Sequence, residues 1–355
     1  MAEKKRQKRL RYVDIFKTIA ILMVVYHHTM TAWSIKEYWF ISFGMSGWFF
    51  ISGLLLKTDS KATIKTSLGY IWKRFLSLMF PYFLWAVFYS KFMPSNLLKI
   101  AYGSHVMLIK AGSLTSLWFL PVLFVSLTLF TVFNCILKDK FNMAVKLVLS
   151  GLSFATAAFI PNKTNGYPWG VDVAVTAFGF LILGSALYPL VQAAYQSLNK
   201  GTKGKIICAI VLVLAATSTM TYKLNLPYLS QASVLMAEAR YGNYLLFLLT
   251  SFLGILFMLA FSVFLDLILK RRGVIGGILT YIGMNTMTIF VVHKPIIRVF
   301  RKVFQLIHAP EVIGVTLTVI LTTAVCCVIA KILDRFVPTM IGKIPQKTTI
   351  PEKSK

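Results

Sequence analysis

The chain has 355 residues, of which 57% are hydrophobic and 14% charged, and its formal net charge is +27. A mean hydropathy of +0.73 excludes an ordinary soluble domain, and the length allows many membrane spans. The basic residues are scattered among short segments between apolar runs and form no module that could grip a phosphate backbone, which excludes nucleic acid as a partner.

The first apolar segment, residues 12–32, contains ionisable side chains that a simple anchor does not need. Such groups are costly in hydrocarbon, so Asp14, Lys17, His27 and His28 are each functional-site candidates. From Lys17 to His28 a helix rises about 16.5 Å and turns about 1100°, which places both on one stripe. Asp14 can pair with Lys17, and His27 is rotated roughly 80° away, so His28 is the better candidate. Alternatively, these residues mark the two ends of an ordinary helix.

Ten apolar segments predict an all-α, polytopic protein with about ten transmembrane helices. The even number, and the alternation of Lys and Arg between loops, predict that both termini are cytoplasmic. The protein is thus expected to be a multi-pass membrane protein in contact with membrane lipid. The predicted spans are residues 12–32, 39–56, 69–90, 117–137, 144–160, 171–191, 206–222, 244–269, 278–297 and 312–333.

The ends of the chain differ in composition from its long apolar middle. Residues 1–11 form a basic cytoplasmic tail, residues 12–335 the transmembrane domain, and residues 336–355 a polar cytoplasmic tail. The first span has no A-x-A cleavage site and is expected to be retained. The cysteines lie in apolar runs without metal-binding spacing, which predicts core packing and no metal site. They are Cys135, Cys208, Cys326 and Cys327.

Two motifs follow in the second and third spans. Ser52 lies in a Phe-Phe-Ile-Ser-Gly sequence, where small residues allow close helix packing and the hydroxyl can bond across the contact. Lys73 and Arg74 precede a Pro-Tyr pair at the start of the third span. The guanidinium fork of Arg74 suits a phosphate-bearing ligand, although topological anchoring explains the position equally well.

The segments between the later spans carry further polar residues. His105 is expected to be an ordinary polar loop residue, and Trp118 has the position of an interfacial belt residue. Glu238 and Arg240 are read as a solvated acid–base pair before the eighth span. A run of cations at the end of the ninth span and just beyond it lies on the side where positive charge is disfavoured. This indicates either a site for an anionic sugar or lipid phosphate, or an interfacial amphipathic helix. These cations are Lys294, Arg298, Arg301 and Lys302.

The pattern Asp14, Lys17 and His28 resembles the first-helix signature of acyltransferase family 3, in which arginine is also common at the position of Lys17. The Ser52 motif, the basic Pro-Tyr segment and the Trp-Phe-Leu at Trp118 are similar to family features, the last especially to fucose 4-O-acetylases. Near the end, a Gly-x-Asn-Thr sequence followed by a His resembles a further family pattern at Asn285 and His293. The matches occur in family order over nearly the whole chain, and the resemblance implies a location in a bacterial plasma (inner) membrane.

The resemblance implies an O-acyltransferase that uses acetyl-CoA as acyl donor, without a metal, and a sugar hydroxyl of a surface polysaccharide or lipid-linked glycan as acceptor. It implies catalytic roles for His28, Lys17 and Asp14, and Lys73 and Arg74 as contacts of the CoA phosphates. The substrate contacts that it implies are Ser52, Trp118, Asn285 and His293. The alternative is a transporter or flippase for a glycan, with the buried charges as a proton relay, but the sequence shows no inverted repeat. A non-catalytic scaffold leaves the stripe of ionisable residues unexplained.

Overall fold

The computed structural model describes residues 10–32, 38–112, 114–198, 204–229, 233–269 and 273–344. Most of residues 1–11 and the end of the 336–355 tail lie outside these ranges. Within them the regular elements are all helical, which confirms the predicted all-α class. Six helices are long and apolar enough to cross a membrane, or seven if one bent pair counts as a single span. The number ten and the location of the termini remain predictions.

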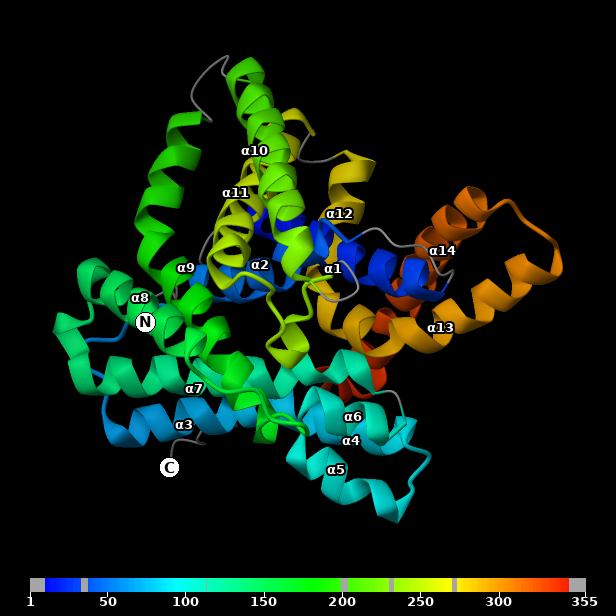
Figure 1. Ribbon diagram of the computed structural model, residues 1–355, viewed down its shortest axis with the longest axis horizontal. Helices are drawn as coiled ribbons and strands as arrows, with labels where there is room; N and C mark the ends of the chain where they lie inside the picture. The colour runs from blue at the N-terminus through cyan, green and yellow to red at the C-terminus, as the bar shows by residue number, and fades with distance from the viewer. Residues whose placement is uncertain are drawn as a thin grey trace, which may run out of the picture.

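Helices occur in each of the ten predicted segments (Figure 1). The helix of the third segment, α3, continues through a π-helical turn (Phe75–Met79) into α4, and two short helices, α5 and α6, follow. Two predicted spans are only short apolar helices, α2 and α8. The bounds are α1 Arg11–Ala32, α2 Ile41–Leu54, α3 Ile64–Arg74, α4 Phe80–Tyr89, α5 Leu97–Tyr102, α6 His105–Lys110, α7 Phe119–Leu137, α8 Met143–Ala158, α9 Val171–Leu198, α10 Gly204–Asn225, α11 Tyr244–Ile268, α12 Val274–Met284, α13 Thr286–Leu306 and α14 Glu311–Phe336.

Helix α1 lies at the centre of the fold and contacts α2, α11, α12, α13 and α14. Its neighbour α12 approaches to backbone contact, because a Cβ atom added at Gly283 would lie 2.1 Å from the carbonyl oxygen of Asp14. The Thr18 hydroxyl donates across the same contact to the carbonyl of Leu279. Small residues and a hydroxyl thus hold α1 and α12 together, as is usual between membrane helices.

Helices α2 and α9 also meet backbone to backbone. A Cβ atom added at Gly53 would lie 1.7 Å from the carbonyl oxygen of Leu181, and one added at Gly184 would lie 2.0 Å from that of Phe50. No L side chain fits at either position without separation of the two helices. Because α2 carries part of the wall of the cavity described below, this contact also positions the candidate site.

We expect Gly184→Ala to destabilise the folded protein by about 1–3 kcal/mol, since overpacking a close contact costs this much. The measurement is the apparent melting temperature of the purified protein in detergent. Gly151→Ala is the matched control, because no atom lies within 4 Å of a Cβ atom added at Gly151 of α8. A Gly184 variant as stable as the Gly151 variant would show that α2 and α9 can move apart without loss of stability.

The prediction of one span over residues 278–297 was wrong in one respect, because the chain bends by 86° between α12 and α13 (Figure 1). The break falls at Asn285, whose side-chain amide donates to the carbonyl of Tyr281 at 2.9 Å. In a continuous helix that carbonyl accepts from the backbone N–H of Asn285, which here donates to Ile282 instead. The bend turns the start of α13 towards the end of α1.

Candidate active site

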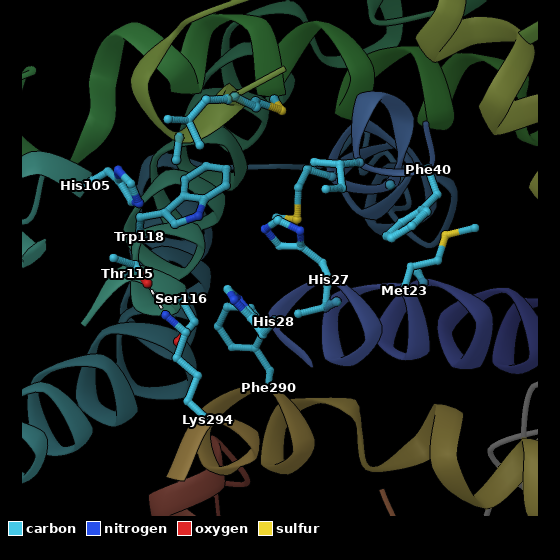
Figure 2. A pocket seen from close by; sticks show the side chains of 18 of the residues that line it. Met23, His27, His28, Phe40, His105, Thr115, Ser116, Trp118, Phe290 and Lys294 are labelled. Carbon is cyan, nitrogen blue, oxygen red and sulfur yellow. Dashed lines mark hydrogen bonds between the residues drawn. The ribbon is translucent and has the colours of Figure 1, made fainter. Parts of the chain in front are cut away.

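A cavity of about 400 Å³ lies at the end of α1 that carries the two histidines (Figure 2). We call it the His28 cavity. Its walls come from α1, α2, α6 and α13, from the 3₁₀ turn Thr115–Trp118, and from residues 234–237 before α11. Elements far apart in the sequence therefore converge on it. Its polar lining residues are His27, His28, His105, Thr115, Ser116, Lys294, Arg298 and Arg301.

The His28 ring is stacked on the ring of His293, with centroids 5.0 Å apart and an angle of 29° between the ring planes. His28 lines the cavity, and among the described residues its ring nitrogens have no hydrogen-bond partner. His27 lines the same cavity, with its ring centroid 5.0 Å from that of His28. Although His27 is rotated by roughly 80° from the stripe of Lys17 and His28, its side chain therefore still lines the same cavity as His28.

His293 lies behind His28 and is fully buried. Its Nδ1 lies 3.0 Å from the carbonyl oxygen of Ile289 and 2.9 Å from that of Phe290. Carbonyl oxygens only accept hydrogen bonds, so Nδ1 carries the proton and Nε2 of the neutral ring is an acceptor. This Nε2 is buried without a partner in the described structure. The predicted substrate contact of His293 is therefore an indirect one, through the stacked ring of His28.

His105 is not the ordinary loop residue that the sequence predicts. It begins α6, is 9% exposed, and lines the cavity opposite His28 (Figure 2). Its Nδ1–H donates to Oε1 of Glu238 at 2.9 Å, which leaves Nε2 as the acceptor of the neutral ring. Glu238 also accepts from Arg240 and is 15% exposed, so the reading of Glu238 and Arg240 as a solvated pair was wrong for the carboxylate.

The hydrogen bond from His105 holds the pKa of Glu238 below its usual value, and Arg240 contributes in the same direction against the effect of burial. The carboxylate therefore stays ionised and keeps the His105 ring in one orientation. No sequence signal indicates this pair, since the two residues are 133 positions apart.

The turn before α7 forms another part of the wall. Trp118 lines the cavity and is 8% exposed, so it lies in the interior of the protein and not in an interfacial belt. In the same turn, Thr115 accepts a hydrogen bond from Nζ of Lys294 (Figure 2). The structure thus brings Trp118 and His28 together, as the resemblance implies, and adds Lys294 to them.

A second cavity, of about 1010 Å³, lies near the opposite end of α1, and we call it the Lys17 cavity. Asp14 and Lys17 line it together with Lys57 and Lys146. Lys146 is buried, and its Nζ donates to the hydroxyl of Ser185 at 3.0 Å. Lys17 and His28 therefore share a helix but open into different cavities. Along α1 the second cavity ends at Lys17 and the first begins at Ala20, about 4.5 Å of helix rise apart.

The other predicted site residues line neither cavity. Arg74 lies over the ring of Tyr70, 4.7 Å from its centroid, and Lys73 is exposed. The hydroxyl of Ser52 donates within its own helix to the carbonyl of Trp48 at 2.7 Å. Asn285 forms the break between α12 and α13. The described part of the chain holds no cluster of three His, Cys, Asp or Glu residues that could hold a metal ion.

Comparison with known proteins gives one match. A family model described as an acyltransferase domain, that of acyltransferase family 3, matches residues 10–331. No curated protein and no solved structure matches the chain. The matched region contains both cavities and all the elements that line them. By this match over most of its length, the chain belongs to acyltransferase family 3.

Proposed function

We propose that this membrane acyltransferase moves an acetyl group from acetyl-CoA to a hydroxyl of a sugar in a surface polysaccharide or lipid-linked glycan. The observation that carries the proposal is His28, an imidazole that lines a cavity without a hydrogen bond to the described residues and is stacked on a buried neighbour. Membership of the family favours group transfer over the transport of a glycan.

The reaction needs little from the protein beyond a base and correct positioning. In the proposed step, His28 takes the proton of the acceptor hydroxyl while the oxygen attacks the thioester carbonyl. The carbon–sulfur bond then breaks, the ester forms, and the CoA thiolate leaves and takes up a proton. A neutral imidazole suits this role near physiological pH, because a thioester is already an activated acyl group.

The Lys17 cavity is the proposed site of the donor's phosphates. Lys17, Lys57 and Lys146 converge on it from three separate elements, and its volume of about 1010 Å³ is large enough for a cofactor fragment. The pantetheine arm must then pass along α1 towards His28, over a helix rise of about 16.5 Å and through the apolar side chains packed between the two cavities. This arrangement favours Lys57 and Lys146 over Lys73 and Arg74 as phosphate contacts, because the latter two line neither cavity.

A transfer assay tests the proposed function. The purified protein in lipid nanodiscs is incubated with [1-¹⁴C]acetyl-CoA and a chemically de-O-acetylated surface polysaccharide. We expect label in the polysaccharide that mild alkali releases, as an ester requires. Movement of a glycan across the bilayer of proteoliposomes without any labelled ester would refute acyl transfer and favour a flippase.

A kinetic comparison tests the donor site. We expect Lys57→Gln to raise KM for acetyl-CoA about tenfold at unchanged kcat, because it removes one charge-assisted contact with a phosphate. Lys73→Gln is the matched control, since Lys73 is also exposed but lies outside the cavity. The reverse result, with KM raised only in the Lys73 variant, would return the donor site to the segment of Lys73 and Arg74.

A further inference from the structure

Helix α13 presents three cations to the His28 cavity: Lys294, Arg298 and Arg301. They are spaced four and three residues apart, so they form one stripe along the helix, which we call the basic stripe. The next cation, Lys302, is exposed and does not line the cavity. The three side chains thus point to the site of the proposed reaction, whereas the cations of an interfacial amphipathic helix would point away from the protein.

Among the residues that the structure describes, no carboxylate pairs with the basic stripe. Lys294 donates to Thr115, a neutral hydroxyl, and Nε of Arg301 is buried without a hydrogen-bond partner. Glu238, which follows the lining residue Ala237, already accepts from His105 and Arg240. Lys294 and Arg301 are half-buried, whereas Arg298 is exposed. Half-buried cations without counter-charges are costly, and a bound anion would remove this cost.

The basic stripe lies close to His28, the proposed base, so an anion bound to the stripe would lie near the reacting hydroxyl. Lys294 directly follows His293, the residue stacked on His28. From Lys294 the helix rises about 6 Å to Arg298 and about 10.5 Å to Arg301. An anionic group held by the arginines therefore shares one cavity with a hydroxyl at His28.

We infer that the acceptor is an anionic glycan, whose phosphate or carboxylate group is bound by the basic stripe while its hydroxyl faces His28. Arginine pairs suit both groups, because their planar forks bind two oxygens at once. The donor's phosphates have the separate Lys17 cavity on the far side of the apolar core. This inference deepens the proposed function and rests on it for the identity of the reacting hydroxyl.

The test compares three soluble acceptors in the CoA-release assay: glucose 1-phosphate, glucuronic acid and methyl α-glucoside. We expect the two anionic sugars to be used at least tenfold more efficiently than the neutral one, and their ratio to show whether phosphate or carboxylate is preferred. Arg298→Gln and Arg301→Gln are each expected to raise KM for the preferred anionic sugar about tenfold and to leave KM for acetyl-CoA unchanged. Lys302→Gln, the matched control, is expected to change neither.

Three results would overturn the inference. Equal use of the neutral and anionic sugars would exclude recognition of the charge. A raised KM for acetyl-CoA in the arginine variants would assign the basic stripe to the donor. Variants that change only the dependence of stability on phosphatidylglycerol in the nanodiscs would assign it to lipid headgroups.

A binding measurement separates the anion site from the proposed chemistry. Calorimetry with the preferred anionic sugar, in the absence of acetyl-CoA, is expected to show binding to the wild-type protein that Arg298→Gln/Arg301→Gln abolishes. Binding without any turnover would refute acyl transfer but keep the anion site. Unchanged binding in the double variant, or none to the wild-type protein, would remove the site itself.

Discussion

Replacing His28 by alanine is expected to lower kcat for acetyl transfer by about 10²–10⁴-fold, the usual contribution of a general base. The loss should appear in kcat and kcat/KM alike, with KM for acetyl-CoA unchanged, because the contact acts in the transition state and not in donor binding. The measurement is steady-state kinetics on the purified protein. Insertion and abundance should be normal, since no hydrogen bond of the protein to His28 is lost.

His27→Ala is the matched control for this result. It lines the same cavity, but its ring is not stacked on His293, so we expect a much smaller loss of kcat. His293→Phe separates positioning from catalysis, because phenylalanine keeps a planar ring behind His28. A His28→Ala variant that keeps wild-type kcat, or an equal loss in the His27 variant, would remove His28 as the catalytic residue.

Replacing His105 by alanine is expected to lower kcat/KM for the acceptor roughly thirtyfold, which corresponds to about 2 kcal/mol. The change removes a ring that lines the cavity and leaves the half-buried carboxylate of Glu238 without its imidazole partner. KM for acetyl-CoA should not change, because His105 lies in the His28 cavity and not in the Lys17 cavity. The measurement is acceptor saturation at fixed acetyl-CoA.

Glu238 is the positioning residue of this pair and gives a graded comparison. Glu238→Gln keeps an oxygen that can accept from Nδ1 of His105, so we expect a smaller loss than for Glu238→Ala. Higher acceptor kcat/KM in Glu238→Gln than in Glu238→Ala would show that the orientation of the His105 ring matters. A His105 variant with normal acceptor kinetics, or one impaired only in KM for acetyl-CoA, would place the acceptor elsewhere.

The sequence predicts well those features that depend on local hydrophobicity. The position of α1 follows from its apolar run, and the all-α class follows from the repetition of such runs. The bend at Asn285 escapes this approach, because a side chain that takes over one backbone carbonyl leaves the apolar pattern unchanged.

The sequence could predict only those features of the candidate site that lie on a single helix. The shared stripe of Lys17 and His28 is a property of a single helix, but the packing that separates their cavities comes from other elements. The pairing of His105 with Glu238 joins residues 133 positions apart and leaves no periodic signal. The basic stripe was visible as a run of cations, yet only the fold shows which of them line the cavity.

The short interval between the two cavities affects whether protons can leak through the protein. On α2, the interval between Met45, which lines the His28 cavity, and Leu54, which lines the Lys17 cavity, contains fully buried apolar side chains such as Phe49 and Ile51. A continuous column of water through a protein that spans the membrane would conduct protons and dissipate the membrane potential. This apolar layer separates the two cavities. If the donor binds as proposed, its acyl arm is expected to cross the layer only by filling the space that it opens.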